Sequence, residues 1–214
     1  LKIQSVEEID VNFLNTNNIL KKFQIKKNSN NYNFIGYQID GEQLVERLLK
    51  GDKKNKISEL FHNINTSLNL NINKIYLEKD TYLEKFIGEF DIKKSKLFLA
   101  KADAILDRNK KFSYSYRTTI KNEKITNILI EYPKPFINNY KFIKGFEEGK
   151  LKLNSMKIGN TSRSNLKITD FKVKEVPVLA KILTLASLQG IADLLTGEGI
   201  RFDQFEMDYK TKNS

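Results

Sequence analysis

Hydrophobic and polar positions alternate along most of this 214-residue chain. The clearest run lies between residues 64 and 72. Its apolar set is Ile64, Leu68, Leu70 and Ile72, and asparagine or serine fills most of the alternate positions. Successive side chains of a β-strand point to opposite faces, so this pattern predicts a strand with one apolar and one hydrated face.

Comparable runs recur along the chain and predict further strands. They are Leu1–Phe13, Phe23–Lys27, Tyr32–Ile39, Phe86–Ile92, Lys96–Leu106, Phe112–Ile120, Ile125–Tyr132, Gly149–Met156, Asp170–Lys174 and the stretch from Ile200 onward. The connections are mostly short and polar, as in Asp107–Lys110 and Lys121–Glu123. Short connections favour antiparallel pairing over parallel crossovers.

Three segments have helical patterns instead. Glu42–Lys50 groups its leucines on one side and is followed by an exposed loop at residues 51–56, with the sequence GDKKNK. A second helix is expected at about Pro135–Lys144. The third begins at Pro177, which suits a first helical turn, and runs to about residue 196, before Gly197 and Gly199 stop it. It is apolar on almost every side, so we expect it to pack against the sheet, an apolar groove or a membrane surface.

These elements predict a mostly β chain with a few helices, of the α+β class. An extended, twisted antiparallel sheet forms an apolar groove, and the C-terminal apolar helix packs at the sheet. Residues 1–214 form a single β-rich region, with the helix at 177–196 inserted between strands. From the alternation alone, the walls of an ordinary closed sandwich or barrel core are the favoured interpretation, and it is the family resemblance described next that favours the groove.

The segment Ile168–Tyr209 carries an ordered set of residues that resembles the C-terminal region of AsmA-like proteins, most closely the YhdP-type branch. Weaker likeness extends to Gly145–Leu153 and Gly36–Leu49. The motif residues in this sequence are Asp170, Phe171, Pro177, Leu183, Ser187, Gly190, Leu194, Gly197, Gly199 and Phe202.

The resemblance implies a periplasmic protein anchored to the inner membrane by a segment outside this sequence. Proteins of this family form a long β-sheet groove with an apolar lining, thought to carry phospholipid toward the outer membrane. The chain starts at Leu1 without methionine and its last residues continue a strand-like pattern. We therefore interpret it as part of a longer polypeptide.

The net charge of +11 raises nucleic acid and anionic membrane as partners. Lysine outnumbers arginine, whereas nucleic-acid surfaces favour arginine for bidentate and stacking contacts. Solvated lysine faces are the simpler interpretation, and attraction to anionic headgroups stays open. The absence of cysteine excludes disulfides and thiolate metal sites.

No pattern in the chain points to catalysis, a metal or a cofactor. His62 is the only histidine and has no partner ligand nearby in sequence. The acidic residues Asp203, Glu206 and Asp208 are interleaved with hydrophobic ones, as on a solvated strand face. Gly197-Glu198-Gly199 follows a helix rather than a strand, which is the wrong context for a phosphate-binding loop.

The sequence therefore predicts a non-enzymatic protein that binds phospholipid acyl chains. The alternative is a scaffold for outer-membrane biogenesis that acts through protein contacts, and a basic nucleic-acid binder ranks below both. Alternate aromatics on one strand fit core or groove lining, or stacking on single-stranded nucleic acid. The groove-lining candidates are Ile64, Leu68, Leu70, Ile72, Phe112, Tyr114 and Tyr116.

Overall fold

The computed structural model of the chain describes residues 7–15, 20–41, 65–78, 81–94, 96–106, 109–137, 145–174 and 199–212. These residues form one sheet of eleven strands and almost no helix, which confirms the mostly β class. The strands are β1 (Glu8–Leu14), β2 (Leu20–Asn28), β3 (Asn31–Asp40), β4 (Thr66–Glu78), β5 (Thr81–Lys93), β6 (Lys96–Leu106), β7 (Lys110–Thr118), β8 (Lys124–Ile130), β9 (Phe146–Ile158), β10 (Thr161–Val173) and β11 (Ile200–Lys212).

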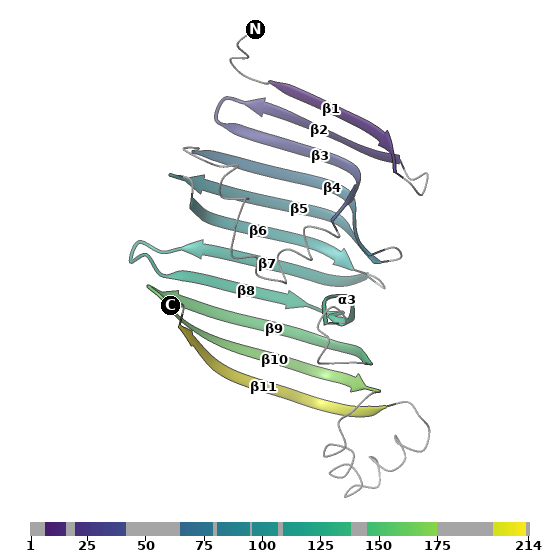
Figure 1. Ribbon diagram of the computed structural model, residues 1–214, viewed down its shortest axis with the longest axis vertical. Helices are drawn as coiled ribbons and strands as arrows, with labels where there is room; N and C mark the ends of the chain where they lie inside the picture. Colours follow the sequence, from purple (N-terminus) through teal and green to yellow (C-terminus); the bar gives the residue numbers. More distant parts are fainter. Residues whose placement is uncertain are drawn as a thin grey trace, which may run out of the picture.

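The strands lie in the sheet in chain order, from β1 at one edge to β11 at the other (Figure 1). Neighbours pair antiparallel except β3 and β4, which pair in parallel with Phe34 opposite Leu70. The prediction of a wholly antiparallel sheet is wrong at this one place. Parallel neighbours need a long crossover, and the connection from Asp40 to Thr66 supplies it.

The sheet is twisted and open, because in the described chain β1 pairs only with β2 and β11 only with β10 (Figure 1). The twist follows from the right-handed preference of each strand. An open sheet leaves both of its faces to be covered by other parts of the chain, by a ligand or by solvent.

One short helix, α3 (Lys134–Ile137), lies within the second segment that was predicted to be helical. Its first turn is closed by Phe136 and Ile137, whose N–H groups donate to the carbonyl of Pro133. Residues 138–144 lie outside the described part of the chain. So do the predicted helices at Glu42–Lys50 and 177–196 and the predicted loop at 51–56.

Inward-facing positions alternate along each strand, but in several strands this alternation shifts by one residue partway along. In β4 the inward set reads Leu70 and Ile72, and then Ile75 and Leu77 after a three-residue step. A similar step separates Ile168 from Phe171 in β10, where Asp170 has a φ of 54° and no partner in either neighbouring strand. The pairing register is the same before and after Asp170, so this is a backbone irregularity rather than an extra residue, and it shifts the alternation of inward-facing positions by one.

Two clusters of buried side chains form the core of the described sheet. The first lies over β4 to β8 and includes Ile72, Leu83 and Leu106. Phe136 of α3 packs against it and stacks on Phe112 with ring centroids 5.7 Å apart. The second cluster lies at the β9–β11 end and centres on Phe146 and Phe171. Both clusters therefore lie toward the strand ends near α3.

Candidate functional site: an apolar sheet face

A continuous row of apolar or small residues crosses all eleven strands on one face of the sheet. Residues directly opposite each other in paired strands project to the same face, so the pairing register identifies the row strand by strand. We call this the central row, and the face that carries it the apolar face. From β1 to β11 the row is Ile9, Ile25, Phe34, Leu70, Gly88, Ala102, Tyr114, Ile128, Leu153, Leu166 and Met207.

The neighbouring row, one residue away on each strand, lies on the opposite face and is polar throughout. Its members are Glu8, Lys26, Asn33, Asn69, Glu89, Lys101, Ser115, Asn127, Asn154, Asn165 and Asp208. Several of these side chains bond across the strands, as Asn69 Nδ2 does by donating to Asn33 Oδ1 at 3.0 Å. We call this the polar face.

The structure brings together the six groove-lining candidates that it describes. Leu68 and Tyr116 belong to one row, through Phe90 and Ala100. Leu70 and Tyr114 lie in the central row. Ile72 and Phe112 both belong to the first core cluster or pack against it, and therefore share the apolar face. Ile64 lies outside the described residues.

Small residues occupy the middle of the apolar face. Gly88 of β5 lies opposite Ala102 of β6. A Cβ atom at Gly88 would come within 2.8 Å of the Phe90 ring and 3.0 Å of the Phe86 ring. The two rings therefore lie over the glycine, and any larger residue at position 88 would displace them.

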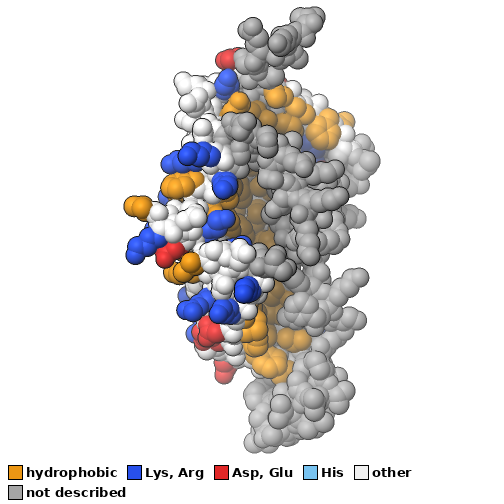
Figure 2. Space-filling view, turned by 60° about the vertical axis from the view of Figure 1, so that its left-hand side comes forward, with side chains coloured by type: hydrophobic (Ala, Val, Ile, Leu, Met, Phe, Trp, Pro, Cys, Tyr) orange, Lys and Arg blue, Asp and Glu red, His pale blue; other side chains and the backbone are white. Residues whose placement is uncertain are grey.

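The apolar face is packed unevenly. Toward α3 it is core, with Ile72 only 1% exposed. Toward the opposite strand ends, Leu68, Phe90 and Leu153 are half-buried and belong to neither core cluster. At the edge strands Ile9 is 41% exposed and Met207 is 40% exposed. Hydrophobic side chains extend along the length of the sheet on the described surface (Figure 2).

Tyr114 is the one titratable group of the central row. Burial among its apolar neighbours raises the pKa of the Tyr114 phenol, and the nearby Tyr116 raises it further. A low-polarity environment disfavours the charged phenolate. The raised pKa of Tyr114 therefore follows from the low polarity of the apolar face.

The family-motif residues that the structure describes gather where β10 meets β11. The Phe171 ring stacks between those of Phe146 and Phe202, with centroids 5.4 and 5.1 Å away. Asp170, which is paired with neither neighbouring strand, directly precedes Phe171. Gly199 has a φ of 92°, and a Cβ there would lie 2.9 Å from the Val173 carbonyl oxygen.

The stacked Phe171 and Phe202 rings join β10 to β11, and the positive φ angles of Asp170 and Gly199 mark irregular backbone at this end of the sheet. The other motif residues lie outside the described ranges. They are Pro177, Leu183, Ser187, Gly190, Leu194 and Gly197.

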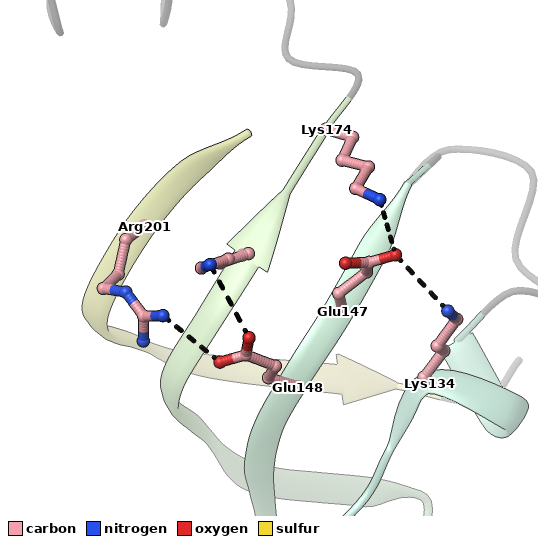
Figure 3. Close-up of polar contacts among 6 residues, drawn as sticks. Lys134, Glu147, Glu148, Lys174 and Arg201 are labelled. Atoms are coloured by element: carbon pink, nitrogen blue, oxygen red, sulfur yellow. Dashed lines mark hydrogen bonds and ion pairs between the residues drawn. The ribbon is translucent and has the colours of Figure 1, made fainter. Parts of the chain in front are cut away.

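Charged side chains near α3 form a compact network (Figure 3). Glu147 accepts from Lys174 at 3.0 Å and from Lys134 at 3.4 Å. The hydrogen bond from Lys174 and the positive charges of both lysines lower the pKa of Glu147. Glu148 pairs with Arg201 of β11 at 3.4 Å. The network links α3, β9, β10 and β11 at their ends.

The residues that could suggest metal or acid–base chemistry are not assembled into such a site. His62 and Glu198 lie outside the described ranges. Asp208 and Glu206 lie on the polar face and accept from Asn165 at 2.9 Å, and Asp203 is exposed. Across the described ranges, no three His, Asp or Glu side chains gather in a way that could hold a metal ion.

A wide-open hollow of about 540 Å³ lies at β8–β11, mainly on the polar face. Asn127, Asn154 and Asn165 contribute to its wall. Sequence alternation did not reveal it. Apolar side chains, among them Ile125 and Met156, line it together with the asparagines.

Comparison with protein-family models, curated protein sequences and solved structures finds no match for this chain. In the described part of the chain, no helix has the length and hydropathy needed to cross a bilayer. The function is therefore inferred from the apolar face itself.

Proposed function

We propose that the chain is a non-enzymatic lipid-handling protein whose apolar face shelters phospholipid acyl chains. The supporting observation is the central row, which stays apolar or small through every strand of an open sheet. A sheet face of this kind must be covered. Exposed apolar areas larger than a few hundred Å² mark binding surfaces in soluble proteins.

The dimensions of the apolar face suit a long flexible ligand. Eleven strands spaced by about 4.8 Å extend over roughly 48 Å from β1 to β11. Acyl chains need no directional polar partners, and in the central row the only hydroxyl is that of Tyr114. Each buried CH₂ group contributes about 0.8 kcal/mol, so affinity would come from many weak contacts.

The part of the face that remains for a ligand is the half away from α3. There Leu68, Phe90 and Leu153 are half-buried and lie outside both core clusters. The half near α3 is packed as core and stabilises the sheet. We therefore place the acyl chains across the strands, over the rows that contain Leu68 and Leu153.

The proposed biological setting follows from the resemblance to AsmA-like proteins. Phospholipid would move along the apolar face between the inner and outer membranes, with the chain in the periplasm as part of a longer bridge. The anchor to the inner membrane would lie in a segment outside this sequence.

The experiment is detergent-free purification of the 214-residue chain from a bacterial host, followed by lipid extraction and mass spectrometry. The test variant is Leu68→Glu combined with Leu153→Glu, on the apolar face. The matched control is Asn69→Glu combined with Asn154→Glu, which adds the same charge one residue away on the polar face. We expect phospholipid with the parent and the control, and at least a tenfold loss with the test variant.

Both variants must remain folded, which circular dichroism and a urea transition would show. Equal lipid content in the two variants would contradict the proposal. A folded parent without lipid would favour the scaffold function, in which the apolar face contacts another protein.

A further inference from the structure

One long margin of the sheet is formed by four β-turns, and we call it the turn rim. It comprises the turns β2–β3, β5–β6, β7–β8 and β9–β10, the adjoining strand ends and the last residues of β11. In Figure 1 these turns lie along the left-hand margin of the sheet. The opposite margin carries α3.

The turn rim is rich in exposed lysines that have few acidic neighbours. Asp91 at this margin accepts from the Ser67 hydroxyl, Glu123 accepts from the Thr119 hydroxyl, and Glu8 pairs with Lys26 at 3.1 Å. Basic side chains outnumber acidic ones on the described surface that Figure 2 turns toward the viewer. Exposed lysines of the turn rim include Lys94, Lys96, Lys121, Lys124, Lys210 and Lys212.

The α3 margin differs, because carboxylates there neutralise many of its basic residues. Glu131 pairs with Lys150 at 3.2 Å, and Asp40 pairs with Lys21 at 2.6 Å. Glu147 and Glu148 hold further lysines and Arg201. The positive charge of the described sheet is therefore concentrated at the turn rim.

Apolar side chains protrude from the turns among these lysines. Ile120, in the β7–β8 turn, has a relative exposure of 107%, so solvent surrounds it on all sides. Ile158 at the β9–β10 turn is 57% exposed. Leu97 and Phe98 beside the β5–β6 turn are 37% and 38% exposed. Turns are ordinarily polar. An apolar side chain at a turn tip is stabilised only when another molecule or another part of the chain covers it.

We propose that the turn rim docks on the surface of an anionic phospholipid bilayer. Ile120 and Ile158 would enter the interface between headgroups and acyl chains, and the flanking lysines would contact lipid phosphates. This pairing of apolar tips with basic residues is the general chemistry of interfacial membrane binding. The apolar tips distinguish a bilayer from a nucleic acid, which would use the lysines alone. Docking goes beyond the proposed function, since it needs no acyl chain on the apolar face.

The first test compares lysines of the two margins. Lys121→Gln combined with Lys124→Gln removes two charges from the turn rim, and Lys22→Gln combined with Lys110→Gln removes two from the other margin. Co-sedimentation with phosphatidylglycerol vesicles measures binding. A surface lysine contributes about fivefold to binding of anionic lipid, so we expect about a 25-fold loss for the rim variant. The control should lose clearly less, and phosphatidylcholine vesicles should bind weakly.

The second test follows insertion directly. The chain contains no tryptophan, so Ile120→Trp introduces a single tryptophan at the turn rim, which can be excited selectively over the tyrosines. Ile87→Trp, at a position 63% exposed on the polar face, is the control. We expect a blue shift and quenching by brominated lipid for the tryptophan at position 120 only.

Four results would overturn the docking proposal. They are failure to bind phosphatidylglycerol vesicles, equal losses in both lysine variants, no blue shift at position 120, and tighter binding to single-stranded oligonucleotides with the same lysine dependence. The Leu68→Glu, Leu153→Glu variant separates the two proposals. It should keep vesicle binding while losing bound lipid.

Discussion

The two faces of this sheet are made from the same strands, yet they differ in almost every property. On the apolar face the central row runs from Ile9 to Met207 without a charged side chain, and on the polar face the adjacent row runs from Glu8 to Asp208 without an apolar one. A shift of one residue along any strand exchanges the two environments. The comparison shows that alternation alone can build a long apolar surface across many strands.

The largest expected effect comes from placing a charge on the packed half of the apolar face. Ile72→Asp puts a carboxylate where the native side chain is 1% exposed. We expect a loss of about 4 kcal/mol in the free energy of unfolding, because the charge has no buried partner. Asn71→Asp makes the adjacent change on the polar face and should stay within about 0.5 kcal/mol. Urea titrations measure both, and similar losses would mean that the face assignment in β4 is wrong.

Alternation predicted the mostly β class and the approximate positions of most strands. The expected strand Lys96–Leu106 has the observed bounds of β6, and the β3 and β7 segments were found within a few residues. β10 was predicted only from Asp170, whereas it starts at Thr161. The reason is Ser164, a buried polar residue on the apolar face whose hydroxyl lies 2.8 Å from that of Ser155. The two serine hydroxyls hydrogen-bond to each other, and Ser164 interrupts the alternation of apolar residues along β10.

Other features could not be predicted from periodicity. The parallel pairing of β3 with β4 depends on long-range contacts that alternation does not encode. The shifts in the alternation of inward-facing positions near Lys85 and Asp170 depend on non-glycine residues with positive φ. Such residues carry no strong sequence signal. For the candidate site, alternation placed Leu68, Leu70 and Ile72 on one face of a strand. Only the pairing register shows which residues of the neighbouring strands share that face. The charge difference between the two margins emerged only from the strand order.

A second prediction tests the backbone irregularity at Gly149 of β9 and Asp170 of β10, two residues with positive φ where the alternation of inward-facing positions shifts. Gly149 has a φ of +81°, and an added Cβ would lie 2.9 Å from Phe171 Cβ. Gly149→Ala should cost about 2–3 kcal/mol from backbone strain and steric overlap. Gly159→Ala is the control, since its φ is +56° but no atom lies within 4 Å of the added Cβ. It should cost about 1 kcal/mol. Equal midpoints in urea would show that packing on Phe171 does not matter.

The smallest expected effect concerns the charged network beside α3, which can be weakened without altering either face. The pKa of Glu147 is lowered in the folded chain, so its contribution to stability is present above the unfolded pKa of about 4.5. That contribution is lost as the pH falls through the folded pKa. Glu147→Gln should cost about 0.5 kcal/mol at pH 7 and reduce the loss of stability on acidification.

The control for that prediction is Glu89→Gln on the polar face, where the Glu89–Lys101 distance is 4.0 Å. This variant removes an exposed carboxylate outside the network, and its stability at pH 7 should stay within about 0.5 kcal/mol of the parent. If Glu147→Gln shows the same acid dependence as the parent, the network does not contribute to the pH response.

The most direct test of the central claim is to map where an acyl chain lies on the sheet. A phospholipid with a diazirine in its acyl chain would be photolysed with the purified chain, and the modified residues would be identified by peptide mass spectrometry. The account predicts labelling on the apolar face away from α3, at Leu68, Phe90, Leu153 and their row neighbours. Labelling mainly on the polar face, or none with a folded protein, would contradict it.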